Sequence, residues 1–249
     1  MAEIRFLRGW SERELAQRLQ QVPALASGIP EGVIDLRPET GWNHVLSHGR
    51  IGEEAPGPPL PSGAFAHARR LVERFSFSDR RIVVGHLDRE SVLQGRSFLL
   101  ELKSLGLHFL CPARVTTVRD ETVEAKTFFG YRYDTLRGHI ERGREWFLLT
   151  KDHRSGEICF RIEAGWLPGD FPNWWSRLGF HLIGRRYQRA WHRLAYAHLR
   201  ASLREWDAQE HGARGRAQVH SGFADAPVAV IGQKAHKPRR LAVEEEHSA

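Results

Sequence analysis

Apolar and polar positions alternate along the middle of the chain, between residues 122 and 164. A period of two residues is typical of half-buried β-strands. The alternation predicts strands over 122–133, 144–151 and 157–164, joined by short turns into an antiparallel sheet. The inward positions of the first and third strands are Val123, Ala125, Thr127, Phe129, Tyr131, Tyr133, Ile158, Phe160, Ile162 and Ala164.

The segments before residue 122 are shorter. Ser11 and Glu14 form a capping box, which predicts a helix that Pro23 ends. Residues 27–63 hold six prolines and are turn-rich, with a short edge strand at 32–36. Spacings of three and four residues predict a second helix over 65–75. Strands are expected at 81–86, 98–102 and 113–118, with a turn at Asp120 and Glu121.

A long helix is predicted from Trp174 to about Trp206. It carries an apolar stripe, and residues 177–204 contain seven arginines and no acidic residue. Residues 207–249 are polar and lack sustained periodicity, so we expect this tail to be mostly disordered. The chain is therefore divided into an N-terminal extension (1–26), a main domain (27–206) and the tail (207–249).

A sheet and a helix that are each apolar on one side are stable when they cover each other. The order of elements therefore predicts an α+β fold. It consists of a curved antiparallel sheet of about six or seven strands around the long C-terminal helix, with additional helices near the N-terminus.

Composition indicates where the protein is expected in the cell and how its charge is distributed along the chain. No run of 18 apolar residues and no secretory leader is evident, and only Cys111 and Cys159 are present, so we expect a cytoplasmic protein. The net charge is +7; residues 205–249 contain six Lys/Arg and seven Asp/Glu, which leaves +8 on residues 1–204. The basic character belongs to the folded part, and basic surfaces attract phosphates, anionic lipids or acidic substrates.

Two segments carry a resemblance to a known family. The first is a signature of fixed spacings from Phe129 to Phe147, and the second runs from Ile158 through a proline turn to Gln188 on the closing helix. Together they resemble the domain of unknown function nineteen-ninety family, over roughly residues 30–204. That family is similar to the START-like helix-grip superfamily, which includes birch-allergen relatives.

The resemblance implies a helix-grip fold with a cavity between sheet and closing helix. Superfamily relatives bind lipids, sterols or polyketides there. The family usually shows G-H-P-E-x-G-E-E, whereas Ile140 replaces the proline and Arg144 the first of the paired glutamates here. The loss of one carboxylate argues against a role that needs an acidic pair.

Polar side chains gather between the glycines of residues 131–147. They have two interpretations: hydroxyls and a histidine–carboxylate pair at the mouth of a cavity, or groups that hold a loop between two strands in shape. As weak catalytic candidates we take His139 and Glu141, which fit the second interpretation better. The residues expected to contact a ligand are Tyr131, Tyr133, Thr135, Glu145, Tyr187 and Trp191.

Metal and cofactor motifs are not evident. His44 and His48 have the spacing of two metal ligands on a helix, but no third ligand lies nearby in the sequence. No phosphate-binding loop, dinucleotide fingerprint, nucleophile elbow or paired-cysteine zinc spacing occurs. We therefore expect neither a metal nor a cofactor. Arg161 and Glu163 alternate with core positions and are expected on the solvent face, paired across strands.

The arginines of the closing helix also have two interpretations. They form a solvated face, or they bind an anionic partner together with nearby aromatic residues such as Trp166, Trp174 and Trp175. These aromatic residues also suit plugging one end of the barrel. His192 and His198 lie on this helix without evident partners, so they are interpreted as packing or surface residues.

Three functions remain open. The first is a binding module for an apolar or amphipathic small molecule. The second is an enzyme that uses the same cavity. The third is a surface-interaction protein whose arginine-rich helix contacts anionic lipid, which we favour over nucleic acid. The sequence does not name the ligand or the oligomeric state.

Overall fold

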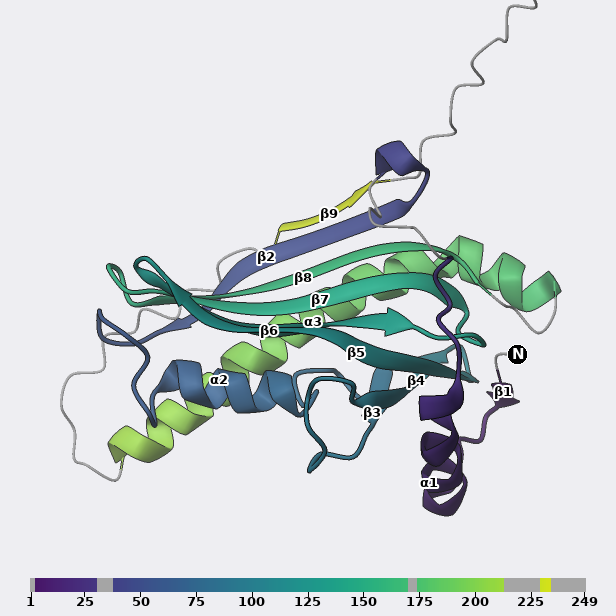
Figure 1. Cartoon of the computed structure of the whole chain (residues 1–249), viewed down its shortest axis with the longest axis horizontal. Coiled ribbons are helices and arrows are strands. Elements are labelled where there is room, and N and C mark those ends of the chain that lie inside the picture. Colours follow the sequence, from purple (N-terminus) through teal and green to yellow (C-terminus); the bar gives the residue numbers. More distant parts are fainter. Residues whose placement is uncertain (1–2, 31–37, 170–173, 213–228, 234–249) are drawn as a thin grey trace, which may run out of the picture.

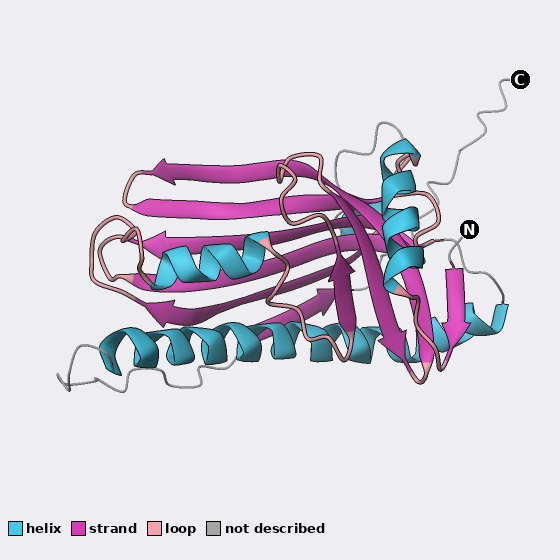
Figure 2. Cartoon of the chain, turned by 90° about the horizontal axis from the view of Figure 1, so that it is seen from below, coloured by secondary structure: helices cyan, strands magenta, loops and turns pink. Residues whose placement is uncertain are grey.

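A computed structural model of the chain describes residues 3–30, 38–169, 174–212 and 229–233. A curved antiparallel sheet wraps around a long helix, and a second helix lies beside that helix (Figures 1 and 2). The elements, in chain order, are β1 (Glu3–Phe6), α1 (Glu12–Gln21), β2 (Asn43–Glu53), α2 (Ala64–Glu73), β3 (Val83–His86), β4 (Ser97–Ser104), β5 (Leu107–Val123), β6 (Lys126–Thr135), β7 (Glu141–Asp152), β8 (Glu157–Pro168), α3 (Trp174–Gly212) and β9 (Ala229–Gln233).

The strands are hydrogen-bonded in the order β3-β4-β5-β6-β7-β8-β2-β9, and β1 pairs with β5. Strands β3 to β8 follow chain order, and the connections after β4, β5 and β7 are short turns. Strand β2 breaks that order, because it returns to pair antiparallel with β8, over Asn43–Glu53 and Glu157–Trp166. Six strands are long, and β1, β3 and β9 are short. The α+β helix-grip fold expected from the sequence is confirmed.

The concave face of the sheet carries the main core. Its centre is Phe77, which follows α2 and has its ring centroid 5.0 Å from Phe147, 5.3 Å from Phe160 and 6.2 Å from Trp191. Tyr196 of α3 donates its hydroxyl to the Phe160 carbonyl at 2.7 Å. Aromatic side chains from the sheet and from both helices therefore fill this part of the interior.

Helix α1 packs on the other side of β4 and β5. Its capping box forms as expected, with Ser11 and Glu14 bonding to each other's backbone. The cluster beneath α1 contains Trp10, Leu99 and Leu110, whose strand neighbours Phe98 and Phe109 face the main core instead. The two faces of one hairpin thus bury two separate apolar clusters.

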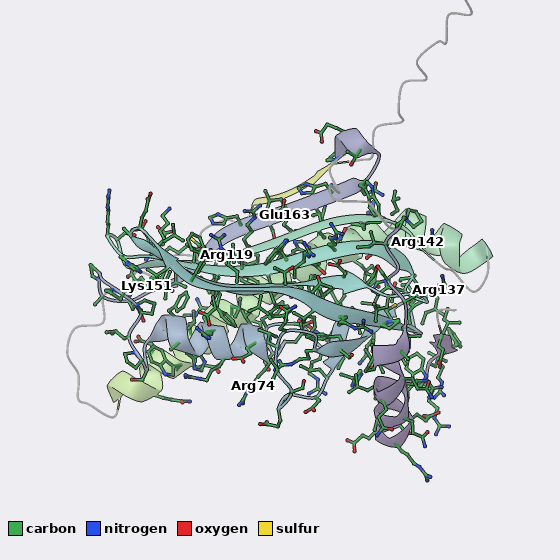
Figure 3. All side chains as sticks on the ribbon, viewed as in Figure 1. Arg74, Arg119, Arg137, Arg142, Lys151 and Glu163 are labelled. Atoms are coloured by element: carbon green, nitrogen blue, oxygen red, sulfur yellow. The ribbon has the colours of Figure 1, made fainter. Side chains whose placement is uncertain are left out.

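The convex face of the sheet is polar where the sequence predicted it. Arg161 and Glu163 of β8 lie there and pair with each other, and His44 Nε2 of the neighbouring β2 lies 3.0 Å from Glu163 Oε1. Figure 3 labels Glu163 on this surface. The expected pairing across strands is confirmed for Glu163, whereas Arg161 pairs with a residue of its own strand.

The structure corrects several local predictions. Strand β5 runs through Asp120 and Glu121, and the turn follows at Glu124, because β5 and β6 remain paired to Val123–Lys126. The helix suggested for His44 and His48 is strand β2, so their side chains do not have helical i,i+4 geometry. Helix α3 ends six residues beyond the predicted Trp206, and β9 pairs with β2 in the tail. The strand predicted at 32–36 lies outside the described residues.

Lys151 explains how the proline-rich loop before α2 is held. Its fully buried ammonium binds Glu54 Oε1 at 2.5 Å and the carbonyls of Ala55 and Pro58 at 3.1 Å. A buried charge is stable only when it is paired and hydrogen-bonded, and here all three donors of the ammonium have partners. Figure 3 shows Lys151 at the end of the sheet opposite Arg137 and Arg142.

Candidate functional site

The loop between β6 and β7 is fixed by its own polar groups. Gly138 has φ +98°, a left-handed conformation that glycine adopts without strain. His139 is buried, and its Nδ1 accepts the Glu141 amide at 2.9 Å. Burial lowers the pKa of His139 to about 3, so the ring is neutral. This arrangement fits the interpretation of His139 as a loop-holding residue.

Thr135 and Gly143 tie the two strands together beside this loop. The Thr135 hydroxyl accepts the Gly143 amide at 2.9 Å. Gly143 itself lies inside β7, where a Cβ atom would come 2.2 Å from the Gly165 carbonyl oxygen. The signature therefore requires glycine here for close approach of two strands, and not for a turn as Gly138 does.

Two tyrosines of β6 point into the interior but have different partners. Tyr131 is fully buried, and its hydroxyl donates to the Val72 carbonyl at the end of α2, at 3.2 Å. Tyr133 lies two residues nearer the loop and donates to Glu145 Oε2 through a short hydrogen bond. Tyr131 thus anchors a helix, whereas Tyr133 belongs to a polar cluster.

Glu145 is the centre of that cluster. It lies on the inner face of β7 and is buried. Desolvation raises the pKa of its carboxyl to about 7, against the lowering effect of the Tyr133 hydrogen bond. Glu141 lies four residues away at the start of the same strand and is half-buried. Desolvation, together with the charge of Glu145, raises its pKa to about 8.

His192 of α3 faces Glu145 from the other side of the interior. Its Nε2 lies 3.9 Å from Glu145 Oε1, beyond hydrogen-bonding distance. Its Nδ1 is 2.8 Å from the hydroxyl of the buried Ser47 on β2. The His192 side chain is 0% exposed, burial lowers its pKa to about 3, and its Nε2 has no hydrogen-bond partner among the described residues.

We define the polar cluster as Ser47, Tyr133, Glu145 and His192, from β2, β6, β7 and α3. The sequence predicted two members, Tyr133 and Glu145. It missed Ser47 altogether and left His192 as a packing or surface residue; the structure shows that His192 is buried, but with an unsatisfied nitrogen. A polar residue on the apolar stripe of a long helix was the available signal for His192.

The other two predicted ligand contacts lie on α3 and are not members of the polar cluster, although the Trp191 ring lies 5.4 Å from that of His192. Trp191 is buried in the aromatic core and donates its indole N–H to Ser78 Oγ at 2.9 Å. Tyr187 is half-buried, one turn earlier on the helix. Trp191 thus fills part of the interior. Trp174 and Trp175 carry side chains that lie outside the described residues.

A small pocket lies between the edge of the sheet and α3. It has a volume of about 20 Å³, room for little more than one water molecule. Its lining comes from Asn43, His44, Val45, Trp166, Gln188, Arg189 and Gly232.

Neither a metal centre nor a membrane span is found in the described part of the chain. Within these residues, no group of three His, Cys, Asp or Glu side chains has the geometry to hold a metal ion. Across the same ranges, no helix is long and apolar enough to cross a membrane.

Comparison with protein families and solved structures gives distant relatives. The family model described as "Domain of unknown function (DUF1990)" matches residues 31–198. The chain is similar to a putative uncharacterized protein from Rhizobium leguminosarum (16% identity, TM-score 0.34, 65% of this chain and 95% of the other). It is also similar to Ara h 8.0201 (10%, 0.36, 66% and 99%) and to human STARD10 (8%, 0.38, 88% and 91%). A comparison with curated protein sequences found no match.

Proposed function

Because the chain belongs to the DUF1990 family, whose description leaves its function open, we propose from the geometry of the polar cluster that the protein binds an amphipathic small molecule between sheet and α3. The observation that carries the proposal is the Nε2 of the fully buried His192, which has no hydrogen-bond partner within the described ranges and lies 3.9 Å from Glu145 Oε1. An unsatisfied buried nitrogen costs about 1–3 kcal/mol. A ligand that supplies the missing hydrogen bond recovers that free energy.

The distance between the two atoms defines the polar group of the ligand. Because the two atoms are 3.9 Å apart, a single ligand oxygen placed beside the line between them would be within roughly 2.8 Å of both His192 Nε2 and Glu145 Oε1. A hydroxyl both donates and accepts. In one tautomer of His192 it accepts from Nε2 and donates to Glu145, and in the other it donates to Nε2 and accepts from the protonated carboxyl of Glu145. We therefore favour an alcohol over a carboxylate, because a second anion beside Glu145 is repelled once Glu145 ionises.

The surroundings of the polar cluster define the rest of the ligand. Phe147 lies two residues from Glu145 on the same face of β7, and Trp191 precedes His192 on α3. Both belong to the aromatic core. A mostly apolar body with one hydroxyl matches this combination of apolar walls and few polar groups.

The test is to ask what the purified full-length chain carries. We expect organic extraction and mass spectrometry to recover an apolar alcohol from the wild type. Glu145→Leu removes half of the polar pair and is expected to lower ligand recovery about tenfold, which corresponds to roughly 1.4 kcal/mol. Glu163→Gln on the convex face is the matched control and leaves recovery unchanged. The proposal is overturned if the wild-type protein is empty and if no fatty alcohol, sterol or lysophospholipid raises its Tm.

An enzyme that uses the same site is the second candidate. It is favoured by Glu145, whose pKa of about 7 suits a general acid or base at neutral pH, and by the Tyr133 hydroxyl bonded to it. The test is to incubate the recovered ligand with fresh protein and to follow its mass. A product that forms with wild type and not with Glu145→Gln supports catalysis. A ligand whose mass does not change contradicts catalysis and leaves ligand binding as the proposed function.

The arginine-rich helix supports a third candidate, contact with an anionic lipid surface. Arg186, Arg189 and Arg193 are exposed and follow one another at three- and four-residue spacing on α3. Such a row places three charges on one side of the helix. Replacing all three by glutamine is expected to abolish binding to anionic vesicles in this case. Binding that is insensitive to salt contradicts it, because exposed charges are screened.

A further inference from the structure

Three exposed apolar side chains, none of which belongs to the polar cluster, gather at one edge of the molecule. Phe6 is 66% exposed, Leu7 73% and Leu105 67%. Phe6 ends β1 and Leu7 comes next, whereas Leu105 lies in the turn between β4 and β5. We call these three residues the apolar tip.

The apolar tip is one continuous surface. The Leu7 amide donates to the Gly106 carbonyl at 2.7 Å, which joins the two segments. A Cβ atom built on Gly106 would lie 3.0 Å from Leu7 Cδ2 and 3.5 Å from Phe6 Cε2. Both side chains therefore lie over the glycine next to Leu105.

The backbone of the apolar tip is strained at both leucines. Leu7 has φ +57° and Leu105 has φ +49°, in the left-handed region that costs a residue with a Cβ about 1–2 kcal/mol. Leu105 and Gly106 (φ +77°) are the two central residues of a two-residue hairpin turn, where Asn-Gly is the favoured pair. At positions 7 and 105 leucine is unfavourable both because the backbone is left-handed and because the side chain is exposed. We therefore expect these leucines to serve function and not folding stability.

The charges around the apolar tip are basic. Glu3 pairs with Arg18, and Glu101 pairs with two histidines. Arg8 comes directly after Leu7, and Lys103 precedes the turn. Among the described residues neither is within ion-pair distance of a carboxylate, although the charge of Lys103 acts on the nearby Glu101 carboxyl. A positively charged border around exposed apolar side chains is complementary to an anionic lipid surface.

We propose that the apolar tip inserts into the surface of an anionic lipid bilayer, with Arg8 and Lys103 at the headgroups. The pairing of Ala113 with Thr135 places the start of β5 at the same end of the sheet as the loop between β6 and β7. This is also the end where α3 begins (Figure 1). The bilayer therefore faces the end of the fold that carries Tyr133 and Glu145.

The experiment compares two substitutions of exposed apolar residues. Leu105→Asn removes an apolar side chain and introduces a residue that tolerates left-handed backbone, so the variant is expected to keep or raise its Tm. The matched control is Val92→Asn, since Val92 is 78% exposed elsewhere on the surface. Full-length proteins are sedimented with vesicles of phosphatidylcholine, with and without phosphatidylserine.

We expect wild type and Val92→Asn to bind vesicles that contain phosphatidylserine, and Leu105→Asn to bind them about tenfold more weakly. Arg8→Gln combined with Lys103→Gln is expected to remove the preference for phosphatidylserine. Equal binding by Leu105→Asn and wild type overturns the proposal and leaves the α3 arginines as the lipid contact. Wild type that fails to bind vesicles and forms a dimer abolished by Leu105→Asn also overturns it, because the tip is then an interface between two copies.

Discussion

Two adjoining regions of the concave interior, which we call the aromatic end (around Phe77) and the polar end (around Glu145), are built from the same kinds of element, yet they differ in the polar groups that they leave unsatisfied. Around Phe77, aromatic rings lie 5.0 to 6.2 Å apart, and the hydroxyl of Tyr196 has a backbone acceptor. Around Glu145, a carboxyl, an imidazole and two hydroxyls are buried together, and His192 Nε2 has no partner among the described residues. The unsatisfied nitrogen at the polar end costs stability, and that cost is what we expect of the proposed binding site.

The largest expected effect comes from the aromatic end. Phe77→Ala removes a fully buried ring in contact with Phe75, Phe147, Phe160 and Trp191. We expect the free energy of unfolding to fall by about 3–5 kcal/mol, measured by urea denaturation. The exposed Val92→Ala is the control and should change it by less than about 0.5 kcal/mol. A loss of only about 1 kcal/mol would show that the aromatic end is loosely packed.

The polar end is expected to respond with the opposite sign. The pKa of Glu145 is raised from 4.5 to about 7 by burial. The folded state therefore holds a proton that the unfolded chain releases between pH 4.5 and 7, and the stability due to this proton is lost as pH rises through that range. Glu145→Gln lacks this loss and should be about 1–3 kcal/mol more stable than wild type at pH 8, with little difference at pH 4.5.

The control for this prediction is Glu163→Gln. The hydrogen bond from His44, more than the charge of Arg161, holds the pKa of Glu163 below its usual value, against the effect of burial. Its ionised form contributes stability above the unfolded pKa, and that contribution is lost as pH falls. At pH 8, Glu163→Gln should therefore lower the free energy of unfolding. Urea titrations of both variants at pH 4.5 and 8 decide the matter, and a loss for Glu145→Gln at pH 8 would mean that Glu145 is stabilised as an anion.

The same contrast explains what could be predicted from the sequence. The aromatic end is encoded locally. Phe129 and Tyr131 on β6 and Phe160 on β8 belong to runs in which every second residue is apolar, and the structure buries all three. Strand β2 was missed because Ser47, His48 and Gly49 interrupt its apolar pattern. Ser47 faces inward nonetheless, because its hydroxyl pairs there with His192. This partner lies 145 positions later in the chain. A polar pair joined by long-range folding leaves no periodic signal in either segment.

The signature of residues 129–147 shows the same limit at single residues. Its spacings identified the family, and the turn at Gly138 could be predicted from glycine alone. The role of Gly143 depends on the Gly165 carbonyl of the next strand, which no local pattern specifies. Likewise, Tyr131 and Tyr133 are equivalent in the sequence pattern. Only the position of α2 and of Glu145 separates a helix anchor from a member of the polar cluster.

The smallest expected effect tests that separation directly. Tyr131→Phe and Tyr133→Phe each remove one buried hydroxyl, and each should cost about 0.5–1.5 kcal/mol of unfolding free energy. The two variants differ in their effect on Glu145. Because the Tyr133 hydrogen bond lowers the pKa of Glu145, Tyr133→Phe should raise that pKa above about 7, whereas Tyr131→Phe should leave it unchanged. Titration of the Glu145 carboxyl by NMR measures the shift. Equal shifts in the two variants would mean that Tyr131 also belongs to the polar cluster. Phe129 would then be the first inward residue of β6 that belongs to the aromatic end alone.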